Sequence, residues 1–380
     1  MKKTGYPPEF AGAVEAASST GGQIMPPIMG AAAFIMAEMT GYEYSDIIVR
    51  AILPAFLYFL GIFLGVHFKA KKLGLVGLKR EELPKWKLLL PKIYLLLPLI
   101  VLTWMVIAGQ TMAKSAIYGT IVAIVVGIIN KDDRMTPSKF VNGLENGGKN
   151  CLSIGIACGI AGIISVCITM TGLGGLLITY VVKLSNGHLF IALFLTMICC
   201  IILGMGVPTT ANYIIMASTC APILINGMGM HILAANMFVF YFGIVADITP
   251  PVALAAYAGA AIAKAPPMKT ALNATRLAIA AFIIPYIFAY NNAMIFVGDV
   301  TFFGVASIVI SATLGMASIA SGFMGYLIHD LKWYSRIALI AGGLLMVIPG
   351  TVTDLAGLAI LIVILLIQRA ENKKEKKAAV

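Results

Sequence analysis

Charged side chains are scarce in this chain. Asp, Glu, Lys and Arg make up only 11% of its 380 residues, against about 25% in a typical soluble domain. Apolar residues make up 60%, and they recur in runs long enough to span the roughly 30 Å hydrocarbon core of a bilayer. This composition excludes a soluble globular protein and predicts an all-α protein that crosses the membrane several times.

Histidine and cysteine are also few. The four histidines are scattered, and the six cysteines lie in apolar segments without the short spacings of metal sites, so we expect the cysteines to be small core residues. No Ser or Cys stands in a pattern with His that would form a nucleophile and its base. We therefore expect no enzyme activity, no cofactor and no metal site built from His or Cys.

The net charge of +11 has an uneven distribution. Its basic residues lie in loops between apolar runs, as the positive-inside rule describes for membrane proteins. The charge therefore indicates orientation in a lipid membrane and not nucleic-acid binding. The loop 67–92 alone carries Lys69, Lys71, Lys72 and five further basic residues, so it is expected in the cytoplasm. We predict a multi-pass protein of the cell inner (cytoplasmic) membrane.

The alternation of apolar runs and basic loops divides the chain into four parts. We predict a broken helix plus one span in 1–66, a cytoplasmic linker in 67–92, a larger membrane unit in 93–290, and membrane helices with a basic tail in 291–380. The sequence PGTVTD (349–354) interrupts the tail. Two arrangements are compatible with this interruption: a helical hairpin that dips into the membrane, which we favour, and one long crossing.

The larger unit has three special segments. Thr136-Pro137 is a helix start signal before few apolar residues, which predicts an interfacial arm helix over 136–150. Glycine and proline in the middle of 188–225 predict a re-entrant hairpin, because they free backbone groups that lipid cannot satisfy. Asp247 and two prolines interrupt 231–263, which predicts a broken helix.

A short unit occurs twice. QIMPP at 23–27 and DITPP at 247–251 are each followed by small and apolar residues. An arginine then opens an apolar run, Arg50 in the first copy and Arg276 in the second. The basic loops place the copies in opposite orientations. Interrupted segments at corresponding positions of two inverted halves point to the binding site of a secondary transporter.

Three stretches carry a family resemblance: GYPPEFAGAVEAASSTGGQIMPP (5–27), LGMGVPTTAN (203–212) and FGIVADITPPVALAAYAGAA (242–261). They resemble the large permease of tripartite ATP-independent periplasmic (TRAP) transporters, most of all the fused permeases that work with TAXI-type solute-binding proteins. The resemblance covers about residues 4–290. It implies an elevator-type fold of two inverted repeats, each with a re-entrant hairpin facing a broken helix.

The resemblance also implies a function and partners. We expect sodium-coupled import of a small organic anion, such as a carboxylate, delivered by an extracytoplasmic TAXI-type solute-binding protein. In that family a first hairpin and a small permease portion precede the GYPPEF stretch, whereas here Met1 falls just after that hairpin should end. We therefore expect the C-terminal part of a longer permease that lacks its N-terminal half. The alternative is a non-transporting membrane fragment or scaffold that needs a separate N-terminal part for activity.

The motifs offer oxygen ligands for sodium, because unwound helices expose free carbonyls and half-helix ends add dipole charge. The candidate sodium ligands are Gly204, Gly206, Thr209, Thr210 and Asn212 in the hairpin, Asp247 and Thr249 in the broken helix, and Thr20, Gly21 and Gln23 in the first copy. For the threonines, ordinary helix–helix hydrogen bonding is the alternative. Asp247 is interpreted as a carboxylate near sodium, with a helix cap, a partner for Arg276 or a proton carrier as alternatives.

An organic anion would be attracted by helix N-termini at the breaks and by a cation within the membrane. The candidate residues for this role are Arg50, Arg276, Pro26 and Pro250. The two arginines have an alternative role as anchors at the membrane interface, with their charged ends in the polar layer.

Overall fold

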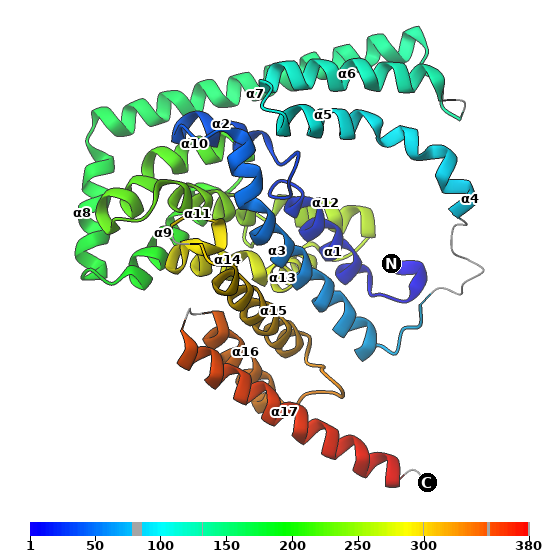
Figure 1. Ribbon diagram of the computed structural model, residues 1–380, viewed down its shortest axis with the longest axis vertical. Helices are drawn as coiled ribbons and strands as arrows, with labels where there is room; N and C mark the ends of the chain where they lie inside the picture. Colours follow the sequence, from blue (N-terminus) through cyan, green and yellow to red (C-terminus); the bar gives the residue numbers. More distant parts are fainter. Residues whose placement is uncertain (78–85, 131, 299, 348–349, 379–380) are drawn as a thin grey trace.

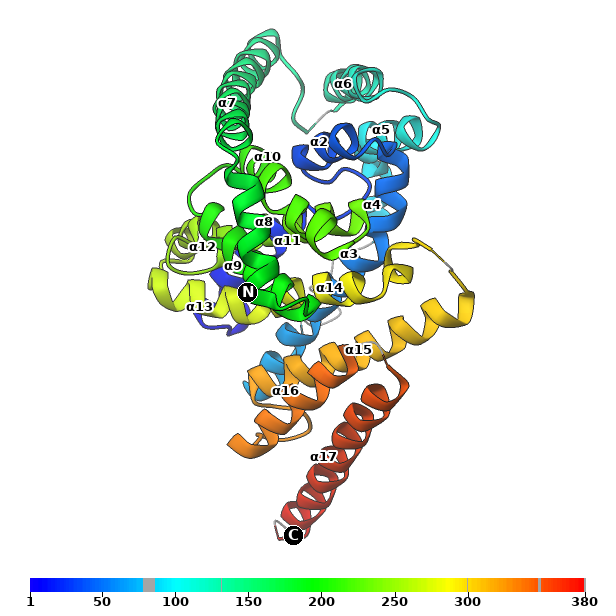
Figure 2. The same ribbon diagram turned by 90° about the vertical axis from the view of Figure 1, so that its left-hand side faces the viewer.

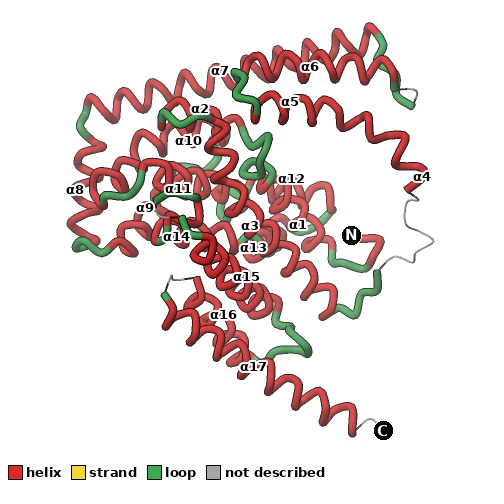
Figure 3. The backbone as a smooth tube through the Cα atoms, in the orientation of Figure 1, coloured by secondary structure: helices red, strands yellow, loops and turns green. Residues whose placement is uncertain are grey.

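The computed structural model describes residues 1–77, 86–130, 132–298, 300–347 and 350–378. Over these residues the chain folds into helices joined by short loops (Figure 3). A single antiparallel bridge between Tyr326 and Asp330 is the only sheet-type contact in the described part. The predicted all-α class is therefore confirmed.

Long apolar helices support the predicted membrane protein. Five helices in the described ranges are long and apolar enough to cross a membrane, or six if one bent pair counts as a single span. These five are Tyr44–Lys72, Leu90–Ile107, Pro267–Tyr290, Phe302–Met324 and Thr351–Glu371.

The first copy of the repeated unit forms α1 (Pro8–Gly21), a break, and α2 (Ala31–Thr40). A proline occupies the first position of α1, where its missing N–H is not needed. Gly41 ends α2 with a φ of +74°, a left-handed conformation that glycine adopts without strain. The long helix α3 (Tyr44–Lys72) follows α2. A short turn, η1 (Lys2–Thr4), precedes α1 at the start of the chain.

Along one side of the molecule lie α5, α6 and α7, opposite α16 and α17 (Figures 1 and 2). The elements in this region are α4 (Trp86–Leu89), η3 (Leu90–Leu96), α5 (Leu97–Ile107), α6 (Met112–Ile129) and α7 (Pro137–Met170). The start of α7 matches the predicted helix start. However, the predicted arm 136–150 is not a separate helix, because α7 continues to Met170. Its several glycines lower helix propensity by about 1 kcal/mol each but leave every backbone N–H in place.

The second copy of the repeated unit lies within the segment from α8 to α14. Its elements are α8 (Leu173–Ser185), α9 (Leu189–Leu203), α10 (Thr209–Thr219), the π-helical turn η4 (Ile223–Gly227), α11 (Ile232–Val245), η5 (Ala246–Ile248), α12 (Leu254–Ala263), α13 (Pro267–Leu277) and α14 (Ile279–Tyr290). Every residue of α11 from Leu233 to Val245 is buried. A helix that is apolar on all sides is expected inside a bundle, and α11 is the core of this one.

Half-helices from the two copies cross each other closely. A Cβ atom built on Gly12 of α1 would lie 2.8 Å from the carbonyl oxygen of Gly259 of α12, and one built on Gly259 would lie 2.6 Å from the oxygen of Gly12. Small residues let the helix backbones approach in this way. The segment before the first break therefore packs against the segment after the second break.

Three helices end the chain: α15 (Phe302–Met324), α16 (Trp333–Val347) and α17 (Thr351–Ala378), after the short turn η6 (Asn292–Ile295). The α15 helix packs along α3. Leu339 of α16 clusters with Leu361 of α17, and a Cβ on Gly342 would touch Ile360. These contacts show that α16 and α17 are antiparallel. Over the described residues, α16 and α17 are thus two antiparallel helices and not one long helix, and their dipping into the membrane as a hairpin stays a prediction.

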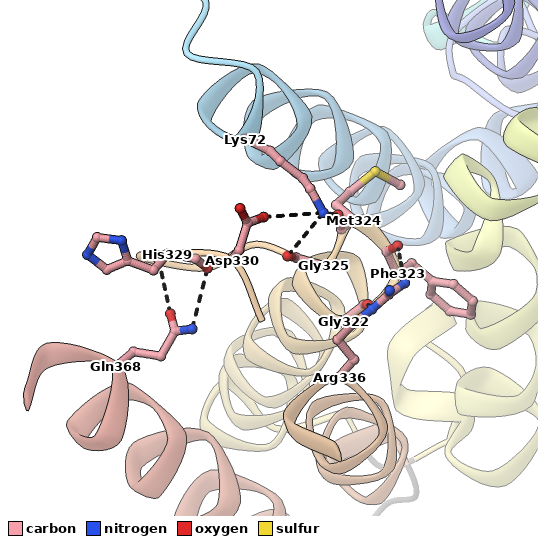
Figure 4. A network of polar contacts seen from close by, with 9 residues as sticks. All are labelled: Lys72, Gly322, Phe323, Met324, Gly325, His329, Asp330, Arg336 and Gln368. Carbon is pink, nitrogen blue, oxygen red and sulfur yellow. Dashed lines mark hydrogen bonds and ion pairs between the residues drawn. The ribbon is translucent and has the colours of Figure 1, made fainter. Parts of the chain in front are cut away.

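Polar contacts join the end of α3 to the loop between α15 and α16 (Figure 4). Lys72 Nζ lies 3.3 Å from Asp330 Oδ1 and donates to the Met324 carbonyl oxygen at 3.3 Å. Arg336 donates to the carbonyl oxygens of Gly322 and Phe323, which end α15. These bonds satisfy carbonyls that a helix end leaves without an intrahelical partner.

Candidate functional site

The two helix breaks have the same local backbone. In each, the second residue after the Pro–Pro pair has a positive φ, 54° at Met29 and 36° at Ala253. In each, the N–H of this residue donates to the carbonyl of the residue before the prolines. The distances are 3.2 Å from Met29 to Met25 and 3.2 Å from Ala253 to Thr249. The sequence repeat is therefore also a structural repeat.

Tyrosine hydroxyls contact the equivalent carbonyl in both breaks. Tyr257 donates to the Pro251 oxygen at 2.6 Å. Tyr44 lies 3.2 Å from the Pro27 oxygen and 2.7 Å from the Ile28 oxygen. Sequence reasoning missed both tyrosines. Tyr257 follows its break by less than two helical turns, and this closeness in sequence could have indicated a contact with the break. Tyr44 starts the next long helix, so its position gives no such indication.

The turn between α9 and α10 meets the second break. Thr209 Oγ1 lies 3.3 Å from Asp247 Oδ2, and Asn212 Nδ2 donates to the Gly243 carbonyl at 3.1 Å. Gly204 permits this approach, since a Cβ there would lie 2.7 Å from Asn212 Nδ2 and 2.8 Å from the Ala246 side chain. The structure thus brings the GMGVPTTAN and ADITPP motifs together.

Oxygen atoms dominate the resulting cluster. Asn212 is fully buried, and its Oδ1 has no hydrogen-bond partner. Thr249 donates its hydroxyl hydrogen to the Val245 carbonyl at 2.8 Å, which leaves the oxygen lone pairs available. Asp247 is half-buried and forms no ion pair with any residue in the described ranges. A buried oxygen without a partner costs about 1–3 kcal/mol unless something satisfies it.

This donor set consists of oxygen atoms of the kinds that hard cations prefer. It combines one carboxylate with neutral amide, hydroxyl and carbonyl oxygens, and oxygen ligands suit hard cations. Within the described part of the chain, no group of three or more His, Cys, Asp or Glu side chains lies close enough together to hold a metal ion.

The remaining candidate sodium ligands occupy varied surroundings. Gly206 has a φ of +75°, so the turn itself requires glycine there, and Thr210 is half-buried at the start of α10. In the first copy Thr20 is buried, and Gln23 is half-buried at the position equivalent to Asp247. A Cβ on Gly21 would lie 2.1 Å from the Tyr58 ring, so the packing of α1 against α3 requires a glycine there.

The candidate anion residues have different surroundings. Arg50 donates to the Phe296 carbonyl at 2.8 Å and stacks over the Tyr42 ring at 5.4 Å from its centroid. Arg276 is exposed at the end of α13. Pro26 and Pro250 lie at the two breaks and are half-buried. The neighbour of Arg276, Thr275, contacts the second break through the Ile248 carbonyl at 3.2 Å, which sequence reasoning also missed.

Comparison with protein families finds a family whose model matches most of the chain. The family described as "Tripartite ATP-independent periplasmic transporter, DctM component" matches residues 1–303. A comparison with curated proteins finds no significant match. The matched range includes both helix breaks and the turn between α9 and α10.

Proposed function

The chain belongs to the family of DctM components of tripartite ATP-independent periplasmic transporters, and we propose that it is the membrane permease of a sodium-driven importer of a small organic anion. The anion class proposed is a carboxylate. The observation that carries the sodium proposal is the contact of Thr209 with Asp247 beside the unsatisfied Oδ1 of Asn212. The match to a transporter family supports the permease over the alternative of a non-transporting fragment or scaffold.

Sodium is proposed to bind where the turn between α9 and α10 meets the second break. Asp247 would offset the positive charge, and Asn212, Thr209 and Thr249 would add neutral oxygens. Thr210 and the carbonyls of Gly204 and Gly206 are further candidates. In the first copy, Thr20, Gly21 and Gln23 are proposed at the corresponding place.

The anion is proposed to bind at the breaks near Pro26 and Pro250, where α2 and α12 begin a few residues later. Helix N-termini carry about half a positive charge and expose N–H groups, which favours a carboxylate. Arg50 and Arg276 are proposed to attract the anion toward these breaks. We propose that the permease lies in the inner membrane and that a TAXI-type solute-binding protein delivers the anion to it. A small permease portion, or a separately supplied N-terminal part, is proposed to complete the assembly.

The proposal is tested by transport. The full chain is reconstituted in proteoliposomes with its small membrane component and solute-binding protein, and uptake of a radiolabelled carboxylate that this binding protein binds is measured under a sodium or a potassium gradient. We expect uptake only with sodium. Asp247→Asn should raise the sodium concentration for half-maximal uptake by tenfold or more, because the carboxylate charge is lost. Asp330→Asn, in the exposed loop of Figure 4, serves as the control. Equal uptake under both gradients would refute sodium coupling.

A further inference from the structure

A polar cavity is lined by none of the residues of the two helix breaks. It has a volume of about 330 Å³ and lies between the end of α14, α15 and the turn between α16 and α17. Its polar lining residues are Asn291, Ser307, Ser311, Thr351 and Asp354. All of these except Asn291 lie beyond residue 303, where the family match ends. The cavity therefore belongs mainly to the C-terminal helices.

Three oxygen atoms converge at this cavity. Ser311 Oγ lies 2.8 Å from the Met346 carbonyl oxygen and 2.5 Å from Asp354 Oδ1. A serine hydroxyl has one hydrogen to donate. It can therefore satisfy the carbonyl or the carboxylate but not both. One of the two acceptor oxygens therefore needs a further partner, either a hydrogen-bond donor or a cation.

The cavity lining does not supply that positive charge. No Lys, Arg or His is among the lining residues, and Asp354 forms no ion pair within the described residues. The nearest basic side chains along α16 lie at its other end and bind there. Lys332 contacts Glu371, and Arg336 binds the carbonyls that end α15. The N-terminus of α17 offsets only part of the carboxylate charge.

The serine at which the three oxygens meet, Ser311, lies well within the length of α15. Ser311 follows the first residue of α15, Phe302, by nine residues, which is about 14 Å along the helix at 1.5 Å per residue. Apolar residues such as Ile287 and Ile308 line the cavity on its other sides. Asp354 is half-buried at this cavity, so its carboxylate is only partly solvated by bulk water.

We propose that this cavity binds a sodium ion through the carboxylate of Asp354 and the hydroxyl oxygen of Ser311. Ser311 then donates its hydrogen to the Met346 carbonyl, so each of the three oxygens has a partner. The cavity has room for several water molecules, at about 30 Å³ each, to complete the ion's coordination. The ion links α15 to the start of α17. This site uses none of the residues proposed for sodium coupling.

The test counts sodium ions. Equilibrium binding of radioactive sodium to the purified full chain is measured for the wild type, Asp354→Asn and Ser311→Ala, with Asp330→Asn as a matched exposed control. We expect Asp354→Asn to bind one sodium ion fewer per chain. Ser311→Ala, which keeps the carboxylate, should weaken binding at one site at least fivefold. The control should match the wild type.

Size-exclusion profiles and thermal unfolding check that each variant is folded, and Ser311→Ala alone decides the outcome if Asp354→Asn does not fold. Unchanged sodium number and affinity in the folded variants overturns the proposal. Asp247→Asn is measured in parallel. If it loses one ion while Asp354→Asn loses none, the C-terminal site is refuted and the coupling site stands. The reverse result refutes the coupling site alone.

Discussion

The crossing of α1 and α12 at Gly12 and Gly259 makes a quantitative prediction about stability. In Gly12→Ala the new methyl group would lie 2.8 Å from the Gly259 oxygen, 3.0 Å from its carbonyl carbon and 3.2 Å from the Ala263 side chain. Two of these atoms belong to the backbone, so they cannot rotate away. Overpacking of this kind costs about 1–3 kcal/mol. Alanine also favours a helix over glycine by about 1 kcal/mol.

Gly143→Ala is the matched control. Gly143 lies on the exposed surface of α7, and a Cβ there has no atom within 4 Å. The same helix-propensity gain of about 1 kcal/mol applies, but no contact opposes it. The difference between the two variants therefore isolates the crossing, and we expect it to be about 1–3 kcal/mol in favour of Gly143→Ala.

The assay is the apparent midpoint of thermal unfolding at one scan rate in one detergent, since membrane proteins often unfold irreversibly and the midpoint then depends on rate. We expect Gly12→Ala to unfold several degrees below Gly143→Ala, and Gly143→Ala to equal or exceed the wild type. If both variants shift upward by the same amount, the backbones of α1 and α12 are not in contact and the reasoning fails.

Two further predictions concern polar contacts. Tyr44→Phe should lower the free energy of unfolding by about 1–2 kcal/mol, because carbonyls in the first break lose their donor. Tyr180→Phe, on the exposed face of α8, should have no effect. Equal thermal midpoints for the two variants would contradict this prediction. Arg336→Met should shorten the lifetime of the detergent-solubilised protein at elevated temperature, since two carbonyls at the end of α15 lose a charged donor. Asp330→Asn should change stability by less than about 1 kcal/mol, because its ion pair with Lys72 is exposed, and a loss as large as that of Arg336→Met would overturn the comparison.

The helix breaks were predictable because their cause is local. Proline lacks an N–H and clashes with the preceding turn, so the two Pro–Pro pairs interrupt their helices wherever they lie in the fold. The boundary expected after residue 150 had no such cause. Near residue 150 the sequence changes from polar to apolar, but no proline interrupts the helix there. Helix α7 therefore continues through this position.

Contacts between distant segments were much less predictable. Tyr44 reaches the first break only because α3 folds back beside it, and no local pattern marks that hydroxyl. For Arg50, the repeat suggested a role in anion binding, but its carbonyl partner at Phe296 is 246 positions away. Thr209 and Asp247 were each notable for polarity within apolar runs, and their contact depends on the tertiary packing of Gly204 against Ala246.

The crossing of the two half-helices also has a consequence for biosynthesis. Gly12 finds its partner 247 residues later, and Lys2 donates to the Ala263 carbonyl at 2.7 Å. At a synthesis rate of about 5–20 residues per second, α1 is made roughly 12–50 seconds before α12 exists. During that interval the small-residue face of α1 has no native partner. The crossing with α12 is therefore among the last contacts that α1 can form, and the early surroundings of α1 must accommodate a helix with one face unpaired.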